Sequence, residues 1–280
     1  MKTVNIKIGI LVATAILFFT SGEIDSVVVK NTSFRVGELV GYDVYYNWGF
    51  IWIHAGSANF SVEEVNYKQR PAYRFYVSGR SLSTFDHFYH VRDTFMSIAD
   101  QASLLPYYYK RVTREDSYWA QDEYLFTTTT SKRTSLVADC KRRKGVRTVD
   151  TISYNGHVTD LITLFYRIRN LDFDRMQINE KHPFAIVFDN DKNPYNLYFR
   201  YLGKGEAELR NGKKYRCIML RPLLIKGKVF KDQEGMTIFL SDDRNRIPIM
   251  VESKIRVGSI KAMLTTATNT LYPLNPLPKK

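Results

Sequence analysis

Apolar and polar residues alternate along most of the chain, and this period of two predicts a mainly β fold. From Phe34 to Val62, aromatic and aliphatic residues share the run with Gly, Asp, Asn, Ser and His, as expected for strands that bury one face. Asn47, Trp48 and Gly49 interrupt the pattern, and Gly49 can adopt the positive φ of a hairpin or bulge. The stretch therefore predicts two antiparallel strands.

Later segments repeat the alternation and extend the predicted sheet. The clearest turn is Asn211-Gly212, because this pair suits the two positive-φ positions of a type I′ hairpin. We expect a large curved antiparallel sheet, an open β-barrel-like architecture, in a single β-rich domain of residues 23–272. Residues 34–154 and 182–272 could form one sheet or two fused β halves, and the pattern does not choose between these alternatives.

One mid-chain segment has the period of a helix instead. Thr159 or Asp160 suits the N-cap, and we expect the helix to span about residues 159–170. The apolar positions at spacing i, i+3, i+4 and i+7, which we expect to pack on the sheet, are Leu161, Leu164, Phe165 and Ile168.

Both ends of the chain lie outside the predicted domain. Residues 1–22 combine Lys2 and Lys7, an apolar run and a small-residue exit, which is typical of a cleaved secretory signal peptide. The apolar run is shorter than the roughly 20 residues that a membrane-spanning helix needs, so a retained anchor is the weaker alternative. Residues 273–280 are Pro-rich, and we expect a disordered tail.

The balance of charge narrows the class of partner. Lys and Arg number 41 against 28 Asp and Glu, a formal net charge of +13. Removing residues 1–22, which hold two Lys and no acid, leaves 39 against 28, or +11. In an exported protein this excess favours anionic surfaces, such as phospholipid or lipopolysaccharide headgroups, over nucleic acid. The alternative is that the surplus of Lys serves only the solubility of the surface and binds no anionic partner.

Two cysteines, Cys140 and Cys217, are present. In an oxidising compartment they could form a disulfide, and two buried free thiols are equally compatible with the sequence.

Three stretches, residues 34–62, 159–170 and 239–264, match a known family in order and spacing. On them the chain resembles the bacterial exported family named domain of unknown function 3108. The family has no assigned reaction, and its helix often has Pro where this chain has Leu161. The motif positions that carry the resemblance are Gly37, Glu38, Trp48, Gly49, Asp160, Thr163, Tyr166, Arg169, Asp243, Arg246 and Pro248.

The resemblance implies a curved antiparallel sheet partly wrapped around a helix, similar to the open barrels of periplasmic lipoprotein carriers. It also implies export to the periplasm, with outer-membrane association or secretion as alternatives. Among the motif residues, Glu38 is expected to form a buried structural ion pair with Arg169 or Arg246.

No motif points to catalysis. Nucleophile elbows and Gly-rich phosphate loops are missing from the sequence. His87 and His90 lack the additional ligands of a metal site, so we interpret them as structural or surface residues. Asp242 and Asp243 are interpreted as turn residues. We therefore predict no catalytic residue, no metal and no cofactor; whether the protein is an enzyme stays open, and a non-enzymatic role is favoured.

The aromatic residues of the hairpin and the helix would enclose either a dry core or an apolar groove. The candidate groove residues are Tyr45, Trp48, Trp52, Phe165 and Arg169.

Three hypotheses of function follow. The first is a cell-envelope protein that binds a lipid or lipid-linked glycan, with basic residues near an anionic headgroup. The second is a structural or assembly protein that binds another envelope protein. The third is a glycan-acting enzyme, which needs two carboxylates across a cleft at about 5 to 10 Å. Peripheral membrane contact is compatible with this picture, and the oligomeric state is not predicted.

Overall fold

The computed structural model describes residues 28–130, 132–188, 193–223, 234–255 and 257–278. The predicted signal peptide, residues 1–22, lies outside these described residues. Among the helices that are described, none has the length and apolar character to span a membrane.

A single antiparallel sheet of fourteen strands dominates the described part of the chain, which confirms the predicted fold class. The strands are β1 (Leu39–Trp48), β2 (Ile51–Tyr67), β3 (Arg70–Ser81), β4 (Arg92–Asp100), β5 (Pro106–Glu115), β6 (Tyr118–Thr129), β7 (Arg133–Arg142), β8 (Arg147–Asn155), β9 (Lys181–Ile186), β10 (Tyr195–Glu208), β11 (Lys214–Pro222), β12 (Met236–Ser241), β13 (Pro248–Lys254) and β14 (Ser259–Thr268). Short 3-10 turns, η1 (Arg143–Gly145) and η2 (Phe173–Arg175), lie in the connections.

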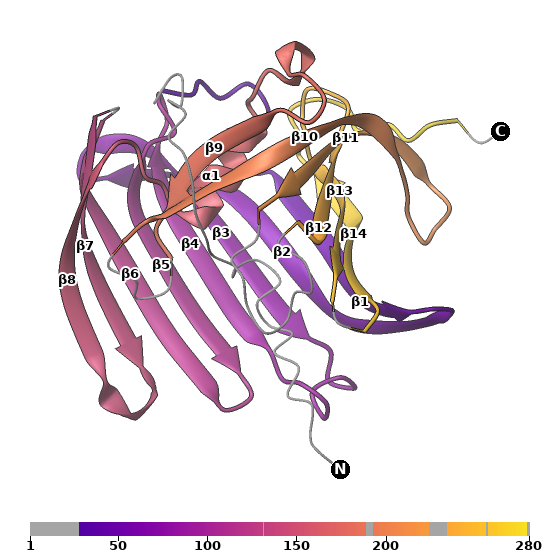
Figure 1. Cartoon of the computed structure of the whole chain (residues 1–280), viewed down its shortest axis with the longest axis horizontal. Coiled ribbons are helices and arrows are strands. Elements are labelled where there is room, and N and C mark those ends of the chain that lie inside the picture. The colour runs from indigo at the N-terminus through magenta and orange to yellow at the C-terminus, as the bar shows by residue number, and fades with distance from the viewer. Residues whose placement is uncertain (1–27, 131, 189–192, 224–233, 256, 279–280) are drawn as a thin grey trace.

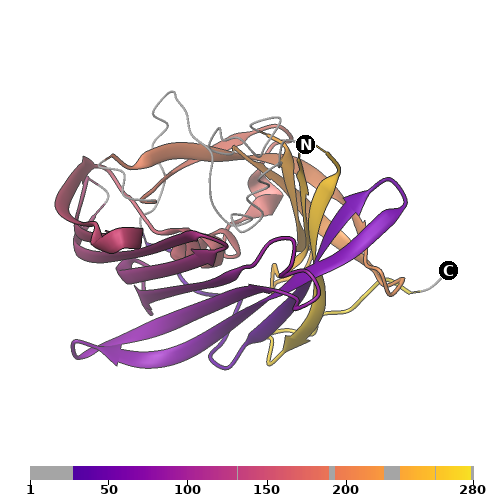
Figure 2. The same ribbon diagram turned by 90° about the horizontal axis from the view of Figure 1, so that it is seen from below.

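The sheet is one meander with a single change of order. Strands run β8-β7-β6-β5-β4-β3-β2-β1-β14-β13-β12-β11-β10-β9, so the first and last strands pair with each other in the interior of the sheet. Both halves of the chain, β1–β8 and β9–β14, therefore belong to one continuous sheet. Its ends, β8 and β9, do not pair in the described residues, and the curled sheet stays open (Figures 1 and 2).

Helix α1 (Leu161–Ile168) connects β8 to β9 and lies within the curl of the sheet, as Figure 2 shows from below. Asp160 is its N-cap and accepts hydrogen bonds from the backbone N–H groups of Ile162 and Thr163, each at 2.9 Å. This carboxylate satisfies amides that have no partner inside the helix. The predicted helix is thus confirmed in place and in its N-cap.

The predicted apolar stripe of α1 packs on the sheet, although it is not the most buried face of the helix. Leu164, Phe165 and Ile168 are half-buried against the apolar clusters, whereas the fully buried helix residues are Ile162, Thr163, Tyr166 and Arg167. The reason is that the helix is enclosed by the curled sheet on several sides, so polar residues are buried too. Arg167 donates to the carbonyl oxygens of Ser103 at 3.3 Å and Leu104 at 3.1 Å.

The apolar interior is divided into several clusters. The largest one joins the inner faces of β2 to β8 with Ile162 and Tyr166 of α1, and it contains Cys140. A second cluster joins β1 and the C-terminal strands and contains Cys217. Both cysteines are buried free thiols, so the structure shows the thiol alternative and no disulfide between them.

The described part of the C-terminal tail contacts the domain, although residues 273–280 were expected to be disordered. Leu274 packs against the second cluster, and the N–H of Leu277 donates to the carbonyl oxygen of Lys214 at 2.7 Å. The tail carries leucines between its prolines, and these offer apolar area to bury.

Candidate functional site

A cavity of about 160 Å³ lies between the central strands and α1. An engineered cavity of about 150 Å³ with an apolar lining holds a molecule of benzene, so this one has room for one ring or a short alkyl segment. Its lining is almost entirely apolar. The lining residues are Tyr42, Val44, Ala55, Gly56, Ser57, Ala58, Phe60, Val77, Gly79, Arg80, Ser81, Phe85, Val91, Asp93, Phe95, Phe165, Pro248, Val251 and Ala262.

Small residues at the centre of the sheet create this space. Tyr42, Ala58, Gly79 and Asp93 are successive cross-strand partners on β1, β2, β3 and β4, and partners in an antiparallel sheet share one face. The two middle members carry a methyl group or no side chain. A Cβ built on Gly79 meets no heavy atom within 4 Å. The space of the cavity therefore lies over Ala58 and Gly79, between the larger side chains of Tyr42 and Asp93.

Aromatic residues close the space from the other side. Phe165 of α1 stacks on Phe60 of β2 with the ring centroids 5.1 Å apart. Phe85, in the loop between β3 and β4, packs with Ala55 and Tyr89 at another wall. Helix α1 and this loop thus set the access of a ligand to the floor.

Two ionisable residues are among those that line the cavity, in contrasting surroundings. Asp93 is buried, its carboxylate accepts from the backbone N–H of Arg114 at 3.0 Å, and it hydrogen-bonds Glu115. Burial, and then the charge of Glu115, raise the pKa of Asp93 to about 7. Tyr89 donates its hydroxyl to Glu115 at 2.7 Å. Arg80 is exposed and forms no ion pair with the described residues, and because it follows Gly79 its side chain lies on the opposite face of β3 from the cavity floor.

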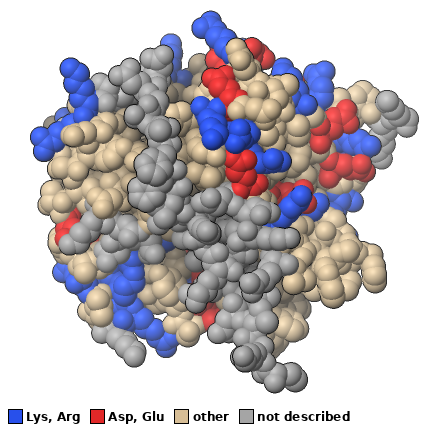
Figure 3. Space-filling view, viewed as in Figure 1, with Lys and Arg blue, Asp and Glu red and all other residues tan. Residues whose placement is uncertain are grey.

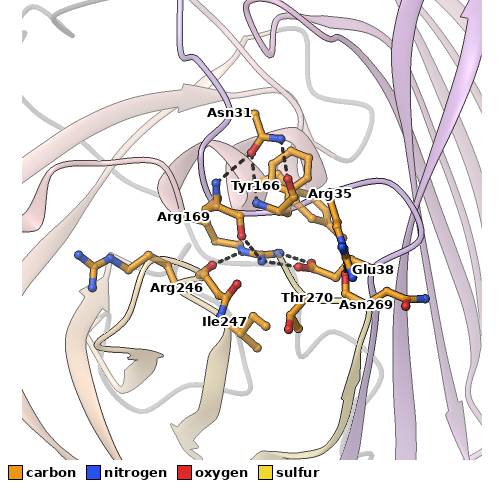
Figure 4. Close-up of polar contacts among 12 residues, drawn as sticks. Asn31, Arg35, Glu38, Tyr166, Arg169, Arg246, Ile247, Asn269 and Thr270 are labelled. Atoms are coloured by element: carbon orange, nitrogen blue, oxygen red, sulfur yellow. Dashed lines mark hydrogen bonds and ion pairs between the residues drawn. The ribbon is translucent and has the colours of Figure 1, made fainter. Parts of the chain in front are cut away.

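A buried ion pair lies beside the cavity and connects four parts of the chain (Figure 4). The guanidinium of Arg169, just after α1, donates to both carboxylate oxygens of Glu38 at 2.6 and 2.9 Å. It also donates to the carbonyl oxygens of Asn245 at 3.0 Å and Ser33 at 3.2 Å. Of the two partners expected for Glu38, the structure shows Arg169. The pair joins the N-terminal segment, β1, α1 and the turn between β12 and β13.

Aromatic rings surround the guanidinium. It lies 5.3 Å from the ring centroid of Tyr166 and 5.6 Å from that of Phe34. Tyr166 stacks on Phe75 of β3 with centroids 3.9 Å apart. The helix end is therefore held by ring contacts as well as by the ion pair.

The remaining motif residues form turns and caps. One oxygen of Asp243 accepts from the backbone N–H groups of Asn245 at 2.8 Å and Arg246 at 3.2 Å, as in a turn. Pro248 begins β13 and contributes to the cavity wall. Gly37 and Gly49 have positive φ angles of 85° and 57°, which glycine adopts without strain.

Of the five predicted groove residues, Phe165 lines the cavity. Tyr45 and Trp52 instead pack edge-on against each other, with centroids 6.1 Å apart, on the second cluster. Trp48 is exposed at the end of β1, and Arg169 is held in the ion pair. The structure does not bring the five together.

Sequence reasoning missed Ala58, Gly79 and Asp93. The run of small residues Ala55-Gly56-Ser57-Ala58 and the lone Gly79 inside a strand were available as indications, since glycine in a strand interior often marks a close approach or a ligand. Their convergence depends on the register between strands, which the pattern alone does not give.

No group of metal-ligating residues is present in the described ranges. His87 and His90 lie in the loop between β3 and β4. Asp93 and Glu115 touch each other through a hydrogen bond, whereas a glycosidase needs its two carboxylates on opposite sides of a cleft.

Comparisons with known proteins agree with this architecture. A family model described as "Protein of unknown function (DUF3108)" matches residues 41–265. Among solved structures, the chain is similar to the crystal structure of a beta-barrel-like protein of domain of unknown function DUF1849 from Brucella abortus. The TM-score is 0.51 at 9% sequence identity, over 84% of this chain and 98% of that chain. At this identity the similarity shows the fold alone. No curated protein matches the chain.

Proposed function

Because the chain belongs to the DUF3108 family of proteins of unknown function, the cavity itself is the best guide to activity, and we propose that the protein binds an amphiphile. A single short alkyl chain or ring occupies the cavity, and an anionic headgroup lies outside it, attracted by the excess of basic residues. The protein acts as an exported, non-enzymatic binder in the cell envelope, with the periplasm as its compartment.

The cavity between α1 and the small residues of the central strands is the observation that carries this proposal. A protein interior is normally packed to crystal-like density, with few voids larger than a water molecule. A space of about 160 Å³ with an apolar lining excludes water and favours hydrocarbon. Transfer of each CH₂ group from water into such a site stabilises the complex by about 0.8 kcal/mol.

Charge supports an anionic headgroup. The excess of basic residues over the whole chain, +13, attracts this class of ligand. Residues 1–22 support export through their sequence pattern.

A first experiment identifies the natural ligand. The protein is purified from an exporting bacterial host and weighed by native mass spectrometry, and organic extracts are analysed for lipid. A stoichiometric lipid or glycolipid is the expected result, whereas a clean apo mass that does not shift with added envelope lipid would contradict the proposal.

A second experiment tests the place of binding. Gly79→Leu inserts a side chain into the cavity, and Ser78→Leu places the same side chain on the opposite face of β3. Calorimetric titration with octanoate should show binding to the parent and to Ser78→Leu, and at least a tenfold loss for Gly79→Leu. Unchanged binding by a folded Gly79→Leu protein would place the ligand elsewhere.

The headgroup is tested by comparing octanoate with octanol. Binding of octanoate should weaken as salt is added and binding of octanol should stay unchanged, because only the carboxylate is attracted by the excess of basic residues. Equal salt dependence for both ligands would exclude an anionic headgroup.

A further inference from the structure

Large apolar side chains are exposed where the β1–β2 hairpin turns. We define the hairpin tip as Trp48, Phe50, Ile51 and Ile53. Phe50 is 94% exposed and Trp48 is 57% exposed, and both isoleucines are also exposed. Figure 3 shows this end of the hairpin as a projection without coloured charged residues at the right of the molecule.

The tip has an apolar face and a cationic one. Trp48 is in register with Ile51, so these two side chains share a face. Trp52 follows Ile51 in β2, so its side chain points to the opposite face of the hairpin. There the guanidinium of Arg210 lies 4.9 Å from the Trp52 ring centroid and the ammonium of Lys261 lies 5.3 Å from it.

Two cations near the tip lack an acidic partner. Arg210 and Lys254 are exposed and form no ion pair with the described residues. Lys254 is opposite Ser259, and Ser259 is opposite Asn47 at the base of the tip. Positive charge therefore lies just behind the apolar end of the hairpin, and the sequence from residue 46 to 53 carries no charge of its own.

This distribution fits a lipid surface better than a protein surface. A stable protein interface buries about 800 Å² on each partner and uses a continuous patch, whereas the tip is a narrow projection. A bilayer surrounds an inserted projection on all sides. Trp is favoured at the level of the headgroups, and nearby Lys or Arg are attracted by anionic lipid.

We propose that the hairpin tip is a peripheral membrane anchor for bilayers that contain anionic lipid. Trp48, Phe50 and Ile51 enter the interfacial region, and Arg210 and Lys254 contact the headgroups. The anchor is a second activity and does not depend on ligand binding in the cavity. It would place that cavity near the bilayer, since Val44 lies four residues before Trp48, about 13 Å along the strand.

Vesicle sedimentation tests the anchor. The purified chain is mixed with phosphatidylcholine vesicles that contain or lack phosphatidylglycerol, at low and at high salt. The variants are a Trp48→Ser/Phe50→Ser double variant and a control, Phe88→Ser, which removes another exposed ring, 81% accessible, from the loop between β3 and β4. All proteins share the same N-terminal residues, so any contribution of these residues is common to them.

The expected result is binding to the anionic vesicles that weakens with salt, that falls by about tenfold or more in the double variant and that is unchanged in Phe88→Ser. Absence of vesicle binding, or binding that the double variant retains, would overturn the proposal. Equal binding to vesicles without phosphatidylglycerol would overturn the role of the cations. Self-association that the double variant abolishes, without vesicle binding, would replace the membrane by a second copy of the chain.

Discussion

Replacement of Glu38 by Gln is the sharpest test of how the fold is held together. The change keeps the size of the side chain but removes its charge, so the guanidinium of Arg169 loses its ionic partner. Side chains of both residues are at most 1% exposed, and water cannot take the place of the lost carboxylate. The guanidinium keeps its bonds to the carbonyl oxygens of Asn245 and Ser33.

The expected loss in free energy of unfolding follows from the burial of the ion pair. Breaking a buried ion pair by removing one partner costs about 3 to 5 kcal/mol, because the remaining charge stays desolvated. Since domains of ordinary stability unfold with about 5 to 15 kcal/mol, Glu38→Gln should remove at least about a fifth of the total free energy of unfolding. The exposed pair of Arg147 and Asp139 provides a matched control, with two hydrogen bonds at 2.8 and 2.7 Å. Asp139→Asn should cost less than about 1 kcal/mol.

Urea denaturation measures both variants. Tryptophan fluorescence and far-UV circular dichroism should give coincident transitions, and the free energies of unfolding then follow by linear extrapolation. If Glu38→Gln lost no more stability than Asp139→Asn, the buried pair would not be the device that joins β1, α1 and the β12–β13 turn. A Glu38→Leu/Arg169→Met double variant should lose less than Glu38→Gln, because no charge remains buried.

Three further predictions concern groups whose pKa is shifted by burial. The folded-state pKa of Asp93 is about 7 and lies above the unfolded value, so the native state holds a proton that the unfolded chain releases. The free energy of unfolding should therefore fall as pH rises from about 4 to 7. Asp93→Asn should reduce this pH dependence, as urea midpoints measured over the same range would show. Burial and the charge of Arg167 lower the pKa of His157 to about 3. The free energy of unfolding should therefore fall as pH drops below about 6.5, where the unfolded chain binds a proton that the native state does not. His157→Leu should remove that loss, as thermal melts at several pH values would show. Burial raises the pKa of both cysteine thiols to about 12, so Ellman's reagent should react with neither in the native protein and with both in urea; rapid reaction without denaturant would contradict the burial.

The local pattern was sufficient for much of the fold. A hairpin forms where it was predicted, with Glu208 paired with Lys214 across it. Its turn is not the predicted type I′, because Gly212 has a positive φ of 77° and Asn211 does not, and the connection spans residues 209–213. The N-cap at Asp160 was also visible in the sequence. These features depend on a few neighbouring residues, and their physical chemistry is complete within the local segment.

Features that depend on distant contacts could not be obtained in the same way. The sequence offered two partners for Glu38, and only the fold brings Arg169, 131 residues away, into contact with it. The cavity depends on Ala58 facing Gly79 across two strands, and a shift of one residue in register would turn both to the other face. The helix period predicted one buried face because it assumes a helix on a surface, whereas α1 is enclosed.

The pairing of β1 with β14 has a consequence for how the protein acquires its structure. Leu39 and Thr268, near the two ends of the folded chain, face each other in register, so the middle of the sheet forms only after the last strand has been synthesised. Each flanking meander is local, but the seam between them closes a loop of more than two hundred residues. A circular permutant that joins these ends and opens the chain between β8 and β9 would convert the sheet into a strictly sequential meander. By the dependence of folding rate on contact order it should fold faster, with the same native contacts.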